Sequence, residues 1–226
     1  MEYYFVVNAK NYDTSIGKNS LNLAKIFNDL QKKMKKTQIL FCVNPADLVY
    51  ITSKIKDLKI GLLLQNFDTS TFGSSTGLTH FKLIKDYGAK GSLINHSENR
   101  LKIDSIYENN LILKKNKMIS IICANNVPIA KALSTLKPDF IAIEPPELIG
   151  GNVSVSKSNP QIIKEGIKVT NDNLLVGAGI KNAMDVRIAI ELGAKGVLVA
   201  SGVCKADDPR KATIDLLKGF GELNEI

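Results

Sequence analysis

Short, almost continuously hydrophobic runs alternate with amphipathic segments along the whole chain. Valine, isoleucine and leucine dominate these runs, which have the length of β-strands and lack a regular alternation of apolar and polar positions. Such runs are typical of strands covered on both faces, as in parallel sheets. We therefore expect eight strands, at residues 3–7, 38–43, 59–64, 91–94, 118–123, 140–143, 174–177 and 196–200.

Helical patterns follow the runs, and several carry signals for their ends. The apolar residues at positions 21, 24, 26, 27 and 30 form one stripe of an amphipathic helix. Asn44-Pro45 and Asn159-Pro160 each place a capping side chain before a proline at the first helical position. The chain thus reads as eight β-then-α units.

The same short sequence, Gly-Ala-Lys-Gly, occurs at residues 88–91 and 193–196, each time between a helical pattern and a strand. The two copies lie a little under half the chain apart, which makes them equivalent parts of units four and eight. This echo favours an α/β fold in which eight parallel strands close into a (β/α)₈ barrel. An open doubly wound sheet is the alternative.

Length and composition indicate one domain spanning residues 1–226. A chain of 226 residues buries roughly 70% of its surface on folding. Hydrophobic residues make up 44% and charged residues 23%, which excludes a disordered or collagen-like chain. No apolar stretch approaches the ~20 residues of a membrane helix, and the first residues do not form a signal peptide.

The numbers of cysteines and histidines and the net charge indicate which compartment, metal sites and partners to expect. Cys42, Cys123 and Cys204 are far apart and only two histidines are present, so we expect reduced thiols, a cytoplasmic protein and no metal site. The net charge of +8 either attracts anions or reflects solvated lysine-rich helix faces. No basic-aromatic platform for nucleic acid is evident.

Polar residues follow several predicted strands, and in this kind of barrel all strands point their carboxyl ends at one face. Asn8 and Lys10 follow the first strand, Asn95-His96-Ser97-Glu98 the fourth, and Glu144 the sixth. The alternative interpretations are that Lys10 is an ordinary surface lysine and that His96 is a histidine with only a structural role in a loop. Glu144 directly follows an apolar strand, where desolvation strengthens a carboxylate as a base.

Small residues end the last two strands, as Gly177-Ala178-Gly179 and Ala200-Ser201-Gly202. They serve either as simple turns or as the phosphate cradle that this barrel builds from backbone N–H groups. Besides this cradle, Glu144 supplies a base, His96 a hydrogen-bonding electrophile and Lys10 a cation. That set suits proton abstraction next to a carbonyl on a small phosphorylated substrate, without a metal. His80 is interpreted as a surface histidine.

Five ordered motifs carry a family resemblance: Asn8-Ala9-Lys10, Asn95-His96-Ser97-Glu98-Asn99-Arg100, Ile143-Glu144-Pro145-Pro146-Glu147-Leu148-Ile149-Gly150, Gly177-Ala178-Gly179-Ile180 and Ala200-Ser201-Gly202-Val203. The chain resembles the triosephosphate isomerase family, in its short archaeal form, over essentially its whole length. The resemblance implies a TIM barrel that interconverts dihydroxyacetone phosphate and glyceraldehyde 3-phosphate without a cofactor, in glycolysis and gluconeogenesis.

By matching position, the resemblance implies that Glu144 is the base, His96 the electrophile and Lys10 the stabilising cation. The family is the standard example of catalysis by a neutral histidine. Substrate-binding positions implied in the same way are Asn8, Ala9, Lys10, Ile149, Gly150, Gly179, Ala200 and Ser201. Ser97 and Glu98 are expected to support His96 from the same turn.

The resemblance also implies a mobile lid at residues 144–156 and self-association into a homotetramer built from dimers. Gly150-Gly151-Asn152 departs from the small-residue trio usual at the lid tip, which loosens the open lid. The loop at residues 66–76, which meets a neighbouring subunit in this family, is also unlike the usual sequence.

Three other interpretations remain at this point. Another phosphate-binding barrel, such as a sugar-phosphate epimerase or a synthase of the tryptophan or thiamine pathways, shares the cradle but not the set of Lys10, His96 and Glu144. A basic nucleic-acid-binding protein fits the net charge. A barrel that has lost turnover through its altered lid fits the fold.

Overall fold

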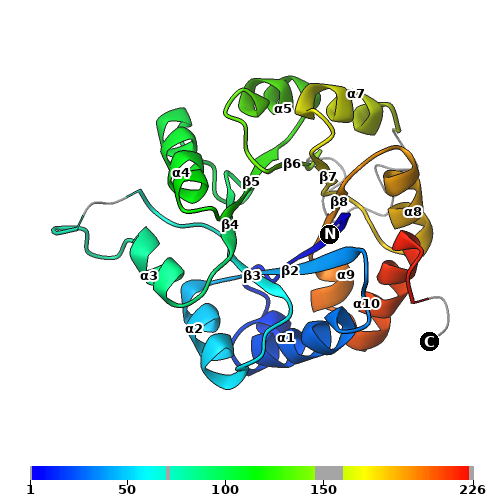
Figure 1. The fold of residues 1–226 in the computed structure, drawn as a ribbon, viewed down its shortest axis with the longest axis horizontal. Helices are drawn as coiled ribbons and strands as arrows, with labels where there is room; N and C mark the ends of the chain where they lie inside the picture. Colours follow the sequence, from blue (N-terminus) through cyan, green and yellow to red (C-terminus); the bar gives the residue numbers. More distant parts are fainter. Residues whose placement is uncertain (1, 70–71, 146–159, 224–226) are drawn as a thin grey trace.

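The chain folds into a closed barrel of parallel strands with helices around it (Figure 1). This computed structural model describes residues 2–69, 72–145 and 160–223. Neighbouring strands pair in the order β1 to β8, and β8 pairs back with β1 in parallel. The predicted (β/α)₈ barrel is confirmed, and the open doubly wound sheet is excluded because β1 has a partner on both sides.

The hydrophobic runs coincide with the strands to within two residues. In chain order the strands are β1 (Tyr3–Asn8), β2 (Thr37–Val43), β3 (Gly61–Leu64), β4 (Gly91–Ile94), β5 (Ile119–Ala124), β6 (Phe140–Ile143), β7 (Leu174–Val176) and β8 (Gly196–Val199). Side chains alternate between the barrel interior and the helix layer, so both faces of each strand are apolar. Val6 belongs to the interior cluster, whereas Phe5 and Val7 pack with the helices.

Helices connect the strands and cover their outer face. They are η1 (Asp13–Ser15), α1 (Lys18–Gln31), α2 (Pro45–Lys54), α3 (Phe81–Asp86), α4 (Ile103–Lys115), α5 (Val127–Ser134), α7 (Pro160–Thr170), α8 (Ala183–Glu191), α9 (Ser201–Cys204), α10 (Pro209–Leu217) and η3 (Lys218–Phe220). Asn44 caps α2 as predicted, accepting the N–H of Asp47 at 2.8 Å. Asn159 lies outside the described residues. None of the helices in the described ranges is long and apolar enough to cross a membrane.

The two Gly-Ala-Lys-Gly segments make equivalent joints. Gly91 begins β4 and Gly196 begins β8, and a Cβ on either would overlap a carbonyl of the next strand, that of Ile119 or Tyr4. In each copy the preceding lysine carbonyl accepts a hydrogen bond from that strand. The contact of β8 with β1 therefore repeats that of β4 with β5, which explains the echo in the sequence.

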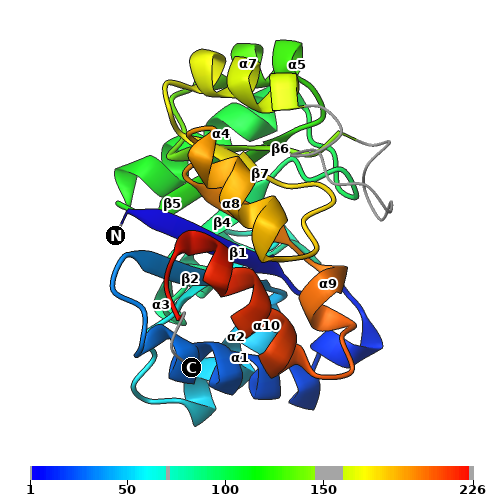
Figure 2. The same cartoon turned by 90° about the vertical axis from the view of Figure 1, so that its right-hand side faces the viewer.

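Both described ends of the chain meet at Lys36, just before β2. The N–H of Glu2 donates to the Lys36 carbonyl at 2.8 Å, and the N–H of Lys36 donates to the Glu222 carboxylate at 2.9 Å. Lys35 and Thr37 also donate their N–H groups to Glu222. Burial alone would raise the pKa of Glu222, but these hydrogen bonds outweigh it and lower the pKa. The start of β1 and η3 lie at one end of the barrel, with α9 at the other (Figure 2).

Candidate active site

A cavity of about 440 Å³ opens at the carboxyl ends of the strands. Its walls come from the loops after β1, β4, β6, β7 and β8. Lining residues include Asn8, Lys10, His96, Glu144, Gly177, Gly179, Ala200 and Ser201. The barrel thus brings residues from five segments that are distant in the sequence to one cavity, as expected for residues that follow its strands.

Glu144 follows β6 and continues the interior side of that strand, two residues after Ala142. Its side chain is 8% exposed and packs directly over Gly177 at the end of β7. A Cβ at position 177 would lie 2.5 Å from Cγ of Glu144, so only glycine leaves room for this carboxylate. The buried Oε2 has no hydrogen-bond partner among the described residues.

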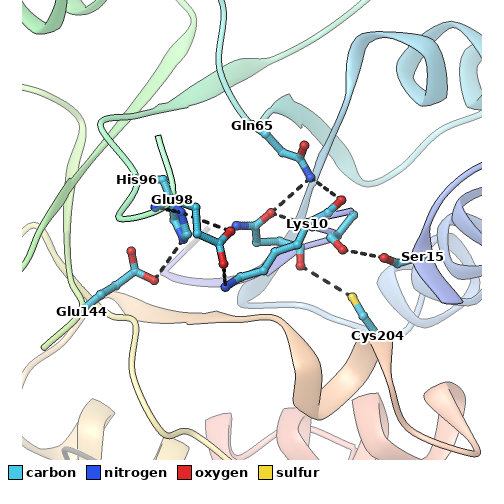
Figure 3. Close-up of polar contacts among 9 residues, drawn as sticks. Lys10, Ser15, Gln65, His96, Glu98, Glu144 and Cys204 are labelled. Carbon is cyan, nitrogen blue, oxygen red and sulfur yellow. Dashed lines mark hydrogen bonds and ion pairs between the residues drawn. The ribbon is translucent and has the colours of Figure 1, made fainter. Parts of the chain in front are cut away.

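His96 faces Glu144 across the cavity, with Nε2 3.5 Å from Oε1 (Figure 3). On the other side of the ring, Nδ1 accepts the main-chain N–H of Glu98 at 3.2 Å. An acceptor nitrogen carries a lone pair, so the proton of the neutral imidazole lies on Nε2. The fold therefore aims an N–H group at the carboxylate and the cavity.

Lys10 reaches the same cavity from the end of β1. Its ammonium lies 2.7 Å from Oε1 of Glu98, and its side chain is 12% exposed. The residue has φ 50°, in the left-handed region, and hydrogen bonds on both sides stabilise this backbone. Its N–H donates to Oδ1 of Asn8 at 3.0 Å, and its carbonyl accepts from Nε2 of Gln65 at 2.9 Å.

Further contacts fix the segment just before Lys10 (Figure 3). The Ser15 hydroxyl donates to the carbonyl of Ala9, and Sγ of Cys204 lies 3.6 Å from the carbonyl of Asn8. Burial raises the pKa of Cys204 to about 12, so it remains a thiol and can donate. Burial also raises the pKa of the neighbouring Tyr12 phenol.

The other two cysteines lie in the barrel wall beneath Glu144. Burial and then the Glu144 carboxylate raise the pKa values of both Cys42 and Cys123. All three cysteines of the chain are buried and unpaired. In the described ranges, no three or more histidine, cysteine or carboxylate side chains are grouped to hold a metal ion.

Backbone at the ends of β7 and β8 forms the remaining wall. Gly179 has φ 68°, and Ala200 immediately precedes α9, whose first residue is Ser201. These loops line the same cavity as Lys10 and His96, and the loop after β8 neighbours the loop of Lys10 because β8 pairs with β1. Ile149 and Gly150, with the rest of the expected lid from residue 146 on, lie outside the described residues.

A profile of the triosephosphate isomerase family matches residues 3–218 of the chain. Triosephosphate isomerases of Archaeoglobus fulgidus and Methanothermus fervidus are 40% and 41% identical to it, each over 94% of this chain and 96% of the relative. The chain belongs to the triosephosphate isomerase family. It is accordingly an intramolecular aldose–ketose isomerase. The relative from Methanocaldococcus jannaschii is 38% identical over 94% of this chain and 98% of its own.

The fold of the family extends to distant members. The crystal structure of triosephosphate isomerase from Bartonella henselae superimposes with a TM-score of 0.72 and covers 96% of this chain and 100% of its own. Only 18% of the residues are identical, so this likeness bears on the barrel alone.

Most described residues expected from the triosephosphate isomerase pattern line the cavity, whereas Ala9 lies behind it and Ser97 and Glu98 lie beside His96, as expected. Ala9 is 1% exposed and its carbonyl is bonded to Ser15, so it supports the loop from behind. Ser97 is half-buried between His96 and Glu98. Glu98 contacts the site twice, through its N–H to His96 and its carboxylate to Lys10.

Sequence reasoning missed residues that act through the backbone. Gln65 follows β3 directly, and its amide holds the carbonyl of Lys10. The strand-end rule also applies to this glutamine, but its residue type alone gives no sign that it binds the carbonyl of Lys10. No sequence signal indicates Cys204, which reaches Asn8 only because α9 turns under the β1 loop.

Proposed function

We propose that Glu144, His96 and Lys10 carry the interconversion of dihydroxyacetone phosphate and D-glyceraldehyde 3-phosphate, which belongs to glycolysis and gluconeogenesis. The observation that supports this most is the hydrogen bond from the Glu98 N–H to Nδ1 of His96. It leaves an N–H on Nε2, facing both the cavity and the Glu144 carboxylate. A base and a hydrogen-bond donor thus lie next to each other at the wall of one cavity.

In this proposal Glu144 removes a proton from C1 of dihydroxyacetone phosphate. The C–H electron pair forms the C1–C2 double bond, and the carbonyl pair moves onto O2 of the resulting enediolate. The hydroxyl proton passes from O1 to O2, and Glu144 returns its proton to C2, which gives the aldehyde. A positioned base contributes typically ~10²–10⁴-fold to the rate of such a step.

His96 and Lys10 stabilise the enediolate in this scheme. The Nε2–H of His96 donates to the oxygens that gain charge, and the ammonium of Lys10 adds a fixed positive charge. One preorganised donor of this kind is worth about 10²–10³-fold in kcat. Lys10 now pairs with Glu98, whose side chain is 60% exposed, so that pair is solvent-screened and readily exchanged for substrate.

The phosphate group is assigned to the wall formed by Gly179, Ala200 and Ser201. Main-chain N–H groups with little side-chain bulk allow close approach of an anion. Asn8 would hold the loop of Lys10, which follows the strand next to β8. Ile149 and Gly150 remain proposed contacts of the same phosphate, from the lid.

A coupled assay of the purified protein with glyceraldehyde 3-phosphate tests the proposal. We expect turnover that is unchanged by a chelator, because no step needs a metal ion or cofactor. Chelator-sensitive turnover would favour a metal-dependent epimerase, and His96→Gln with parental kinetics would remove the imidazole from the mechanism.

We further propose that this single domain of residues 1–226 assembles as a homotetramer built from dimers. Phe72 is 77% exposed and lies against His80, which caps α3 by accepting the N–H of Lys82. His80 is therefore a capping residue as well as a surface one. In this proposal a second cavity of about 540 Å³, lined by Lys10, Asn11 and Gln65 among others, receives a segment of a second copy.

Light scattering on an eluting peak tests the assembly. We expect about four times the chain mass of 24.7 kDa for the parent and a smaller species for Phe72→Asp. Cytoplasmic location is proposed from the three buried thiols, which fit a reducing compartment. Fractionated cells probed for the protein would test it.

A further inference from the structure

We propose that Asn95 is the positioning residue that turns His96 into the cavity and holds it there. The inference rests on the proposed role of His96 and adds a residue that does not line the cavity. It comes from three observations: the side alternation of β4, the backbone of Asn95 and the hydrogen bonds of its side chain.

Alternation along β4 places Leu93 inside the barrel and Ile94 in the helix layer. Continued as a strand, the chain would direct residue 95 inward and residue 96 outward, away from Glu144. Asn95 instead has φ 63°, in the left-handed region. This turn reverses the alternation, and His96 faces the cavity. Glu144 needs no such turn, because it continues the interior side of β6.

The side chain of Asn95 holds the turn from both directions. Its Nδ2 donates to the carbonyl of Cys123 at 3.1 Å, one residue beyond the last pair of the β4–β5 ladder, Ile94 with Ile122. Its Oδ1 accepts the N–H of Leu101 at 3.1 Å. The side-chain amide therefore adds one more hydrogen bond between β4 and β5 at the point where the main chain turns away. It also connects the start of the loop to Leu101 at its end.

The main chain of Asn95 adds a third bond, because its carbonyl accepts from the Arg100 guanidinium at 2.8 Å. Asn95 itself is only 7% exposed. Residues 96–99 lie between Asn95 and its partners Arg100 and Leu101. This segment includes the ring of His96 and the N–H of Glu98 that fixes its tautomer. Asparagine suits the position because it tolerates the left-handed region and also donates and accepts hydrogen bonds. Glycine offers only the first property, and alanine neither.

The test compares Asn95→Gly and Asn95→Ala with the parent in the purified full chain. Asn171→Gly is the matched control, because Asn171 also has a positive φ, of 51°, but is exposed at the opposite end of the barrel. We expect kcat to fall at least about tenfold in Asn95→Gly and further in Asn95→Ala, with KM within about threefold of the parent. The control keeps the parental kcat.

A readout beyond stability is the ¹⁵N spectrum of the His96 imidazole. In the parent we expect the tautomer with the proton on Nε2, and in Asn95→Gly a shift toward averaged tautomers as the Glu98 contact loosens. Parental kcat in Asn95→Gly, or a fall in kcat with an unchanged imidazole spectrum, would overturn the inference. His96→Gln separates the two proposals: if it leaves kcat intact the role of His96 fails, whereas loss there with normal Asn95→Gly defeats only the positioning role.

Discussion

Nε2 of His96 lies 3.5 Å from Oε1 of Glu144, with both side chains more than nine-tenths buried. The length of the glutamate side chain sets this separation. Glu144→Asp withdraws the carboxylate by about 1.5 Å. We expect kcat to fall by about 10²-fold with KM nearly unchanged, since misplacement on the 1 Å scale has effects of that size.

Steady-state kinetics in both directions measure this effect. Glu222→Asp is the matched control, because it makes the same change at the far end of the barrel and should leave kcat at the parental value. Equal turnover of Glu144→Asp and the parent would rule out Glu144 as the base.

Lys10→Ala removes from the cavity wall the ammonium group that lies 2.7 Å from Oε1 of Glu98. We expect KM to rise and kcat to fall together, with a loss in kcat of about 10²–10³-fold. Lys32→Ala is the control, because Lys32 pairs with Asp29 on an exposed helix face. Normal kinetics for Lys10→Ala would return this lysine to the surface-charge interpretation.

Gly177→Ala tests the room that Glu144 needs. The added methyl lies 2.5 Å from Cγ of Glu144, so the carboxylate must shift. We expect kcat to fall on the order of 10-fold or more. In a Glu144→Ala background Cγ is absent and this clash is removed, so Gly177→Ala should lower Tm less there than in the parent. Equal losses of Tm in the two backgrounds would contradict this explanation.

The Glu222 carboxylate links stability to pH. Its pKa is lower in the folded chain than in the unfolded chain, so its contribution is complete above the unfolded pKa and disappears as pH falls through the folded one. Glu222→Gln should lower Tm by about 2–4 °C at pH 7. The gap from the parent should close as pH falls below about 4.

Thermal melts from pH 7 to pH 3 measure that gap, with Glu108→Gln on the exposed face of α4 as the control. A gap that stays constant across this range would show that the carboxylate charge of Glu222 does not contribute.

Thiol labelling tests the burial of the cysteines. Cys204 has a pKa near 12 and both Cys42 and Cys123 have raised pKa values, so thiolate is scarce at neutral pH. We expect no rapid reaction with an aromatic disulfide reagent in the native protein, and reaction of three thiols per chain after unfolding. Rapid labelling of the folded chain would contradict the burial described here.

The fold could be predicted because parallel strands buried on both faces leave a strong sequence signal. Each hydrophobic run became a strand, and the repeated Gly-Ala-Lys-Gly indicated two equivalent joints before Gly91 and Gly196. Closure could be inferred from this echo, although direct evidence came only from the pairing of β8 with β1.

The sequence predicted those site residues whose reactive side chains lie just after the end of a strand. Lys10, His96 and Glu144 differ in character from the apolar strands that they follow, and the barrel brings those ends together. Gln65 and Asn95 were not assigned roles, because their amides act on backbone atoms whose positions depend on turns. A positive φ at Asn95 or Lys10 depends on contacts from other strands, which spacing along the chain does not reveal.

The meeting of Glu2 and Glu222 at Lys36 has a consequence for the order of the units. A peptide linker could join the two described ends, because Glu2 through its N–H and Glu222 through its carboxylate both contact Lys36. A circularly permuted chain, opened at a loop on the same end of the barrel, would keep every strand pair and leave the cavity at the opposite rim untouched. The position at which the polypeptide starts can thus be changed without changing the arrangement of the catalytic residues.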